Sequence, residues 1–232
     1  MRNILIFLAL LLSAACTPFA YSPAPPTPEH ISVVYTPALI WMGDDLNRCA
    51  LEHPEISLTV EERSAASLQV EAAAATLTLD TIPEGFSGTT TQLGWEQVVI
   101  IANTDISSTQ LELPDLQNLY KSLAPEYQAW SYPTSSELQK LFSKIILNGI
   151  EQSPHTKIAP NPQAMLTALE GSSQAVGFIP ISLFSTRNIQ IIPMPIEIES
   201  ALNLPVLALT TGEPSGATRL FLGCLTDSLK LD

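Results

Sequence analysis

HISVVYTPALIWMGDDLNRCALEHPEISLTV, residues 30–60, decides the fold class of this chain. The β-branched run at 30–35 predicts a strand, and Pro37 stands where the first turn of a helix tolerates proline. Apolar residues then recur at helical spacing from residue 39 to about residue 53. A second run with strand alternation occupies 56–61. Strand, helix and strand in this order predict a parallel sheet.

The rest of the chain continues the alternation. An Ala-rich stretch at 64–75 has a helical pattern, TLTL at 76–79 predicts a third strand, and the Gly- and Thr-rich 80–94 is expected to be a loop. QVVIIA at 97–102 predicts a strand buried on both faces. Further helices are expected near 113–120, 135–147, 161–170 and 216–229, and further strands near 127–132, 175–179, 189–192 and 206–209. The pattern predicts an α/β protein.

The N-terminus is typical of an export signal at residues 1–15. Arg2 precedes an apolar run at 4–12, and small residues lead up to Cys16. The run is shorter than the roughly 20 residues that a membrane-spanning helix needs. The small residues before cysteine resemble a lipobox, so we expect Cys16 to carry a lipid; the alternative is ordinary cleavage near residue 15 and an incidental thiol. The Pro-rich remainder of 16–29 predicts an extended tether.

Composition narrows the possible partners. Hydrophobic residues make up 46% of the chain and charged residues 14%, so about 200 residues can bury a large core as one domain or two lobes. The net charge of −13 argues against nucleic acid and anionic lipid surfaces, which require basic patches. A small anion remains compatible, because local dipoles can hold it whatever the global charge.

Two further cysteines, Cys49 and Cys224, lie too far apart in sequence for a local metal site. An even pair in an exported protein favours a disulfide, and two separately buried thiols are the alternative. The three histidines show no metal-ligand spacing, and no motif of a serine nucleophile or a nucleotide-binding loop is present. We therefore expect no metal, no cofactor and no enzymatic activity.

Four segments carry a resemblance to a known family. They are LGWEQVVIIANTD (93–105), LELPDLQNLYKS (111–122), YPTSSELQKLFSKIIL (132–147) and NPQAMLTALEGSSQAVGFIP (161–180). In order and spacing they resemble the phosphate-binding family of ABC importers, within the type 2 periplasmic binding proteins. The resemblance implies a two-lobed α/β fold in which each lobe is a mostly parallel sheet flanked by helices.

The same resemblance implies a division of the chain and a place for the ligand. Lobe one would comprise 30–103 plus 180–232, and lobe two would comprise 104–179. The ligand would occupy the cleft between the lobes, which close on it by hinge motion. In this family an oxyanion is held without metal, by hydroxyls and backbone N–H groups at helix starts. The residues expected to bind the ligand are Thr36, Ser64, Thr134, Ser135 and Ser136.

Each of these hydroxyls could instead be an ordinary helix N-cap, because Ser and Thr favour that position for local reasons. The sequence also departs from the family pattern: Pro37 removes one N–H donor, and Glu137 brings a carboxylate close to a bound anion. Like charges at short range repel unless one of them is protonated. The site is therefore altered relative to the family, either toward another solute or toward loss of solute binding. Five aromatic residues could stack on an organic solute or complete the core: Tyr35, Trp41, Trp95, Trp130 and Tyr132.

These observations together predict an exported, lipid-anchored solute-binding protein that faces the periplasm or the cell exterior. It would act as a monomer and deliver phosphate or another small oxyanion to an ABC permease. The alternative is a binding-protein-fold lipoprotein with a degenerate cleft that acts in sensing or as a protein-interaction module.

Overall fold

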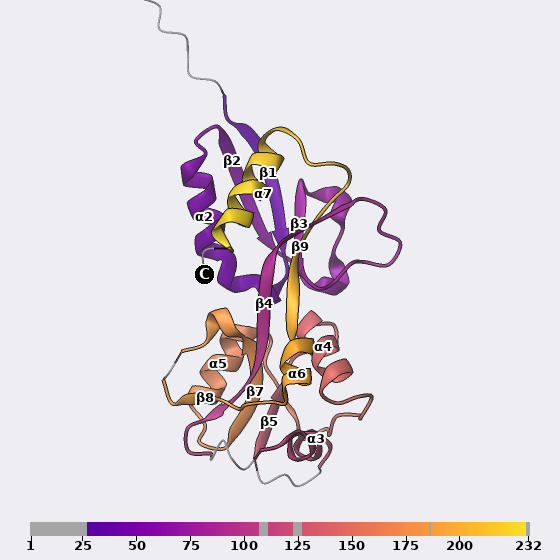
Figure 1. Cartoon of the computed structure of the whole chain (residues 1–232), viewed down its shortest axis with the longest axis vertical. Helices are drawn as coiled ribbons and strands as arrows, with labels where there is room; N and C mark the ends of the chain where they lie inside the picture. The colour runs from indigo at the N-terminus through magenta and orange to yellow at the C-terminus, as the bar shows by residue number, and fades with distance from the viewer. Residues whose placement is uncertain (1–26, 107–110, 123–126, 186, 231–232) are drawn as a thin grey trace, which may run out of the picture.

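A computed structural model describes residues 27–106, 111–122, 127–185 and 187–230 (Figure 1). The expected signal segment, Cys16 and the tether up to residue 26 lie outside the described residues. No helix in the described ranges has the length and apolarity needed to cross a membrane. The chain folds into two lobes that lie one above the other in Figure 1, as the sequence predicts.

Lobe one is a sheet covered by helices from both ends of the chain. It contains β1 (Glu29–Tyr35), 3-10 helix η1 (Pro37–Met42), α2 (Gly43–Glu52), β2 (Ile56–Glu62), 3-10 turns η2 (Ala65–Ser67) and η3 (Val70–Ala72), β3 (Ala75–Leu79), β9 (Asn203–Thr210) and α7 (Gly216–Ser228). β2, β1 and β3 are parallel neighbours, and β9 joins β3 in antiparallel orientation. α2 and α7 lie side by side at the upper end of Figure 1.

Lobe two repeats this arrangement with shorter strands. It contains α3 (Leu113–Lys121), β5 (Gln128–Ser131), α4 (Glu137–Ile145), β6 (Lys157–Ile158), α5 (Pro162–Glu170), β7 (Ala175–Pro180), 3-10 turn η5 (Ile181–Leu183), β8 (Ile189–Ile191) and α6 (Ile196–Ala201). β7, β5 and β6 are parallel neighbours. In its core the rings of Phe142 and Phe178 stack with centroids 4.0 Å apart, and Tyr132 meets Phe178 edge-on at 5.0 Å.

One strand, β4 (Thr89–Asn103), belongs to both lobes. Its first part, 89–97, pairs with β9 in lobe one, and 98–103 pairs with β7 and β8 in lobe two. The boundaries expected from sequence therefore need correction: 98–103 and the segment from 181 to about 202 lie with lobe two. Strand pairing is the reason, because β8 adds to the lobe-two half of β4, and the chain re-enters lobe one only when β9 begins.

The carboxylate of Glu96 is buried at this crossing. It accepts hydrogen bonds from the Ser182 hydroxyl at 2.7 Å and from the Ser182 backbone N–H at 3.3 Å. Burial raises the pKa of Glu96, and the two bonds from Ser182 oppose that increase. The contact joins β4 to the segment that leaves β7, so it stabilises the point where the two lobes meet.

The expected helix at 64–75 is wrong. The segment forms η2 and η3 instead, and of its described side chains only Val70 and Ala75 are buried. A short helix needs tertiary packing along one face, and alanine propensity alone is insufficient at this length.

The expected loop at 80–94 is also too long, because Thr89–Thr91 already pair with β9. β1 begins at Glu29, one residue inside the expected tether.

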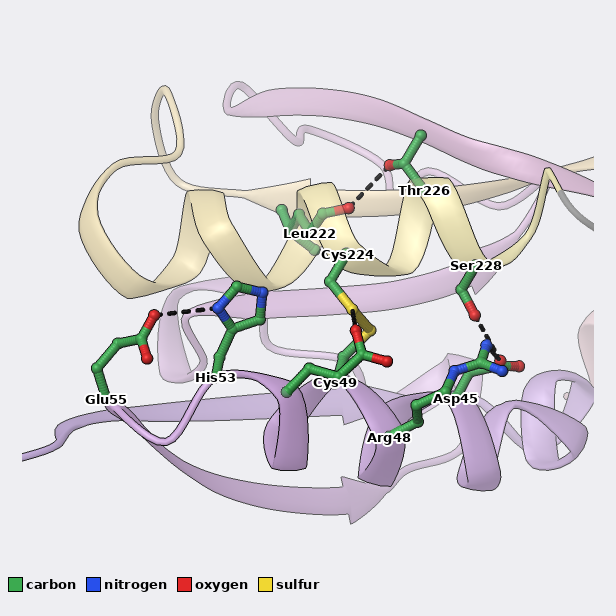
Figure 2. The surroundings of a disulfide bond; sticks show 10 residues. Asp45, Arg48, Cys49, His53, Glu55, Leu222, Cys224, Thr226 and Ser228 are labelled. Atoms are coloured by element: carbon green, nitrogen blue, oxygen red, sulfur yellow. Dashed lines mark hydrogen bonds and ion pairs between the residues drawn. A yellow bond between two sulfur atoms is a disulfide. The ribbon is translucent and has the colours of Figure 1, made fainter.

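Cys49 of α2 and Cys224 of α7 form a disulfide across 175 residues of sequence. Figure 2 shows the bridge between the two helices, with the Ser228 hydroxyl donating to Asp45 Oδ1 at 2.7 Å nearby. Of the two alternatives considered from sequence, the structure has the bridge. It fixes the C-terminal helix to the first half of lobe one.

Reduction of this disulfide is expected to lower the free energy of unfolding by about 2–5 kcal/mol, because a very long loop of the unfolded chain is released. Urea unfolding of a soluble chain that begins at Thr17 measures the effect with and without reductant. The double variant C49S/C224S is the control and should be insensitive to reductant. Equal stability of the oxidised and reduced wild-type protein would contradict the structural importance of the bridge.

Candidate ligand-binding cleft between the lobes

A small cavity of about 100 Å³ lies where the two lobes meet. Lobe one contributes the residues that follow β1 and β2, and lobe two contributes the starts of α4 and α5. The lining residues are Thr36, Pro37, Ala38, Ser64, Ala65, Pro133, Ser135, Ser136, Glu137, Pro160, Asn161 and Pro162. Four of the five expected ligand-binding residues are among them.

Lobe one presents its polar groups at the carboxyl ends of parallel strands, the usual ligand position in α/β proteins. Thr36 follows β1, is fully buried, and is fixed by a backbone hydrogen bond from its N–H to Leu77 O at 3.2 Å. Its carbonyl accepts the N–H of Leu39 at 2.9 Å, which begins η1. Ser64 follows β2 at the same edge, because β1 and β2 run in parallel.

Lobe two presents Ser135 and Ser136 on the turn before α4. Tyr132 anchors the beginning of this turn: it is buried, and its hydroxyl donates to Phe178 O at 2.7 Å. Phe142 anchors the helix itself through its stack on Phe178. The two serines therefore stand on a segment that is fixed to the core at both ends.

The expected hydroxyls do not act as ordinary helix caps. Thr36, Ser64 and Ser136 occupy N-cap positions, and none of the three makes a side-chain cap hydrogen bond. In contrast, Asn161 caps α5 by accepting the N–H of Ala164 at 2.9 Å. Local helix capping does not explain the serines, and their hydroxyls are available to a ligand. Thr134, the fifth expected residue, is exposed and does not line the cavity.

Glu137, the first residue of α4, reaches across the cleft. Its side chain is 2% exposed, and its Oε2 accepts a hydrogen bond from the Thr36 hydroxyl of lobe one. The other oxygen, Oε1, is buried without a hydrogen-bond partner among the described residues. Burial raises the pKa of Glu137 to about 7, opposed by the Thr36 bond, by polar groups of Leu79 and Thr81, and by the charge of Lys140.

The cavity has an unusual charge balance for an anion site. Among the described residues that line it, Glu137 is the only ionisable one, and no lysine or arginine is present. No group of His, Cys, Asp or Glu side chains in the described ranges has an arrangement suited to a metal ion. Hydroxyls, an amide and helix-start N–H groups are the polar groups that a ligand would meet.

The size of the cavity favours a very small ligand. Its volume corresponds to about three water molecules at liquid density, whereas pockets for drug-sized organic ligands measure about 300–1,000 Å³. None of the five aromatic residues considered for stacking on an organic solute lines it. Tyr132 instead belongs to the core of lobe two.

Sequence reasoning missed part of the lining. Asn161, Pro133 and Pro160 line the cavity although none was expected there. The Asn161-Pro162 pair did signal a helix start, but no local pattern shows that this start faces the cleft. The sequence did raise the carboxylate of Glu137 as a departure, without indicating its contact with Thr36.

Comparisons with known proteins establish the fold. No protein-family model matches the sequence, and no curated protein matches it significantly. A solved structure described as a phosphate ABC transporter substrate-binding protein from Clostridium perfringens, with bound phosphate, matches with a TM-score of 0.71 at 12% identity, covering 85% of this chain and 93% of that one. An ABC-type phosphate transport receptor from Vibrio cholerae matches with a TM-score of 0.65 at 18% identity, covering 87% and 96%.

The fold also occurs outside transport. The sulfate-bound regulatory domain of an OxyR2 mutant from Vibrio vulnificus matches with a TM-score of 0.64 at 10% identity, covering 88% of this chain and 96% of that one. Identities this low show similarity of fold alone. The chain therefore has the two-lobed α/β fold of periplasmic binding proteins, a fold used both for solute capture and for regulation.

The raised pKa of Glu137 predicts a specific pH dependence of stability. A carboxyl whose pKa rises from 4.5 to about 7 on folding makes the folded state bind more protons, so stability falls as pH rises between these values. The loss is on the order of 3 kcal/mol. In E137Q this component should disappear, while the contribution of Glu96, whose pKa is also raised, remains.

Urea unfolding from pH 4.5 to 8 measures both slopes. The exposed carboxylate variant E151Q is the matched control and should keep the wild-type slope. If E137Q and wild type lose stability equally over this range, the buried carboxyl does not have the raised pKa assigned to it.

Proposed function

We propose that this chain is an exported, lipid-anchored solute-binding protein that captures phosphate or another small oxyanion for an ABC importer. The observation that carries the proposal is the convergence of three uncommitted serine hydroxyls, Ser64, Ser135 and Ser136, from both lobes on one cavity of about 100 Å³. The proposal assigns the protein no catalytic step. It acts as a monomer, and its partner is a membrane permease.

The chemistry of the cavity favours an oxyanion over a neutral solute. The first N–H groups of α4 have no partner within the helix, and they lie at the positive end of its dipole. The start of a helix with hydroxyls beside it is a well-established anion site. A tetrahedral anion presents acceptor oxygens in several directions, which suits donors that come from two lobes. The small volume also suits an inorganic ion.

Glu137 restricts which oxyanion can bind. A fully ionised oxyanion beside an ionised carboxylate in a partly desolvated cavity would be repelled by several kcal/mol. The two can share the cavity when one proton lies between them, either on the oxyanion or on Glu137. Hydrogen phosphate carries such a proton at neutral pH, and the raised pKa of Glu137 allows the carboxyl to supply one. We therefore favour phosphate over sulfate at alkaline pH.

The N-terminal sequence supports the exported, anchored part of the proposal. The apolar run at 4–12 and the small residues before Cys16 indicate a signal and a lipid attachment site. The Pro-rich stretch that follows would space the binding lobes from the membrane. Labelling of the expressed protein with a fatty-acid analogue, with C16S as the control, tests this part separately.

A second function is favoured by one observation. The Thr36–Glu137 hydrogen bond joins the two lobes across the cleft, and no lysine or arginine lines the cavity in the described part of the chain. A cleft bridged by its own side chains suits a sensing or protein-interaction module. The two functions differ in whether a small solute stabilises the protein.

Thermal unfolding of the soluble chain from Thr17 tests the proposed function. Phosphate, sulfate, molybdate, amino acids and sugars are compared one at a time. A solute at about 100 times its dissociation constant should stabilise the protein by roughly 2.7 kcal/mol, a shift of several degrees in the midpoint. We expect phosphate to produce this shift. The absence of any shift from every solute, with the protein folded and free of co-purified ligand, would favour the interaction module.

Serine variants locate the site. S135A and S136A should each lose most of the phosphate-induced shift, because a donor to the anion is removed. S215A is the matched control for S136A, since Ser215 also holds an N-cap position without a side-chain cap bond, at the start of α7 and outside the cavity. A phosphate shift that is unchanged in both cleft variants would place the anion elsewhere.

A further inference from the structure

The contact between Thr36 and Glu137 has a role that anion binding alone does not require. Thr36 belongs to lobe one and Glu137 to lobe two, and their hydrogen bond is a direct polar link across the cleft. The carboxyl lies by the ends of β1 and β3, where Leu79 and Thr81 also act on it. This is the edge at which an α/β lobe receives a ligand. The Glu137 carboxyl therefore lies at the edge of lobe one where a solute is expected to bind.

We propose that Glu137 is a resident carboxyl group that holds the lobes closed when the cleft contains no solute, and that it releases them when it loses its proton. The device is pH-sensitive closure of a two-lobed binding protein without its ligand. The solute would then compete with Glu137 for the Thr36 hydroxyl. That last clause rests on the proposed function; the closure itself does not.

The burial of Glu137 gives the closure its dependence on the proton. In the closed form the carboxyl is 2% exposed, and Oε1 is buried with no hydrogen-bond partner among the described residues. An ionised carboxylate with one bare buried oxygen is costly, whereas the neutral acid is not. Opening of the lobes would return the group to water, where the charged form is favoured. Closing therefore takes up a proton, and the closed population falls as pH rises from the ordinary carboxyl pKa of 4.5 to the raised pKa of about 7.

No other titratable group that acts on the carboxyl reverses this sign. Lys140, exposed on the same helix, lowers the pKa of Glu137 and does not cancel the effect of burial. Lobe one contributes Thr36, Thr81 and the Leu79 backbone, none of which titrates in this range. Arg63, next to the cavity residue Ser64, is held in an ion pair with Glu61 at 2.6 Å.

Two substitutions of Glu137 separate closure from charge. E137Q keeps an oxygen that can accept the Thr36 hydroxyl but cannot ionise, so it should stay closed at every pH. E137A removes the acceptor and should open. T36V removes the donor with little change in shape and should open as well. E151Q removes an exposed lobe-two charge that does not line the cleft and should behave as wild type.

Small-angle X-ray scattering of the soluble chain from Thr17, without any solute, measures lobe opening as the radius of gyration. Wild type should be compact at pH 4.5 and larger at pH 8, with the closed-to-open ratio falling up to tenfold per pH unit between 4.5 and about 7 and changing little above 7. E137Q should be compact at both pH values, and E137A should be expanded at both. Far-UV circular dichroism checks that every variant is folded.

The outcomes distinguish this inference from the proposed function. If E137A is as compact as wild type, or if E137Q shows the same pH-dependent expansion as wild type, Glu137 does not control closure and the inference is overturned. A parallel titration with inorganic phosphate tests solute capture alone. Opening as expected with no response to phosphate would keep the closure device and reject the phosphate-binding function.

Discussion

Strand β4 belongs to two sheets at once, and the position of the cleft depends on that constraint. Its first part completes the lobe-one sheet beside β9, and its second part pairs with β7 in lobe two. A strand cannot slip by one residue without moving every side chain to the other face, so the pairing register of both sheets is fixed along β4. Glu96 and Ser182 reinforce this point with buried hydrogen bonds.

At the crossing, ends of strands from lobe one meet starts of helices from lobe two. In lobe one the carboxyl ends of β1 and β2 point into the interface, and in lobe two the starts of α4 and α5 do so. Ends of strands and starts of helices expose backbone donors that have no partner within the element. The same geometry that joins the two lobes therefore produces a polar cavity between them. The disulfide joins α2 to α7 within lobe one, and neither of its cysteines lines the cavity.

The electrostatics of the cavity are set by one carboxyl rather than by a cation. Net charge is −13, and no lysine or arginine among the described residues lines the cleft. Burial raises the pKa of Glu137 to about 7, although the hydrogen bond from Thr36 of the opposite lobe lowers it. In the proposed function, solute capture, proton occupancy and lobe closure would be linked through this single side chain. This linkage is what distinguishes the proposed function from simple anion binding by helix dipoles.

Much of the fold and part of the site could be predicted from sequence. The strands at 30–35 and 97–102 were evident because buried parallel strands are continuous apolar runs. Helix starts carry Ser and Thr, so Thr36, Ser135 and Ser136 could be placed as candidates. The Thr36–Glu137 bond could not be predicted. The two residues are 101 positions apart in the chain, and they meet only because the two lobes come together.

The Ala-rich stretch at 64–75 was misassigned for a related reason. Its helical pattern is local, but a helix of that length forms only where a partner surface covers one face, and this stretch lies largely exposed. The lobe boundary after β7 was missed because β8 joins β4 by a pairing that no local pattern encodes.

A crystal structure of the soluble chain grown with phosphate at pH 7 would show whether a solute displaces Glu137 from Thr36. We expect a phosphate ion between Ser64, Ser135 and Ser136, with one of its oxygens within hydrogen-bond distance of Glu137 and the Thr36–Glu137 bond broken. A cleft that holds only water, with Thr36 still bonded to Glu137 at saturating phosphate, would contradict it.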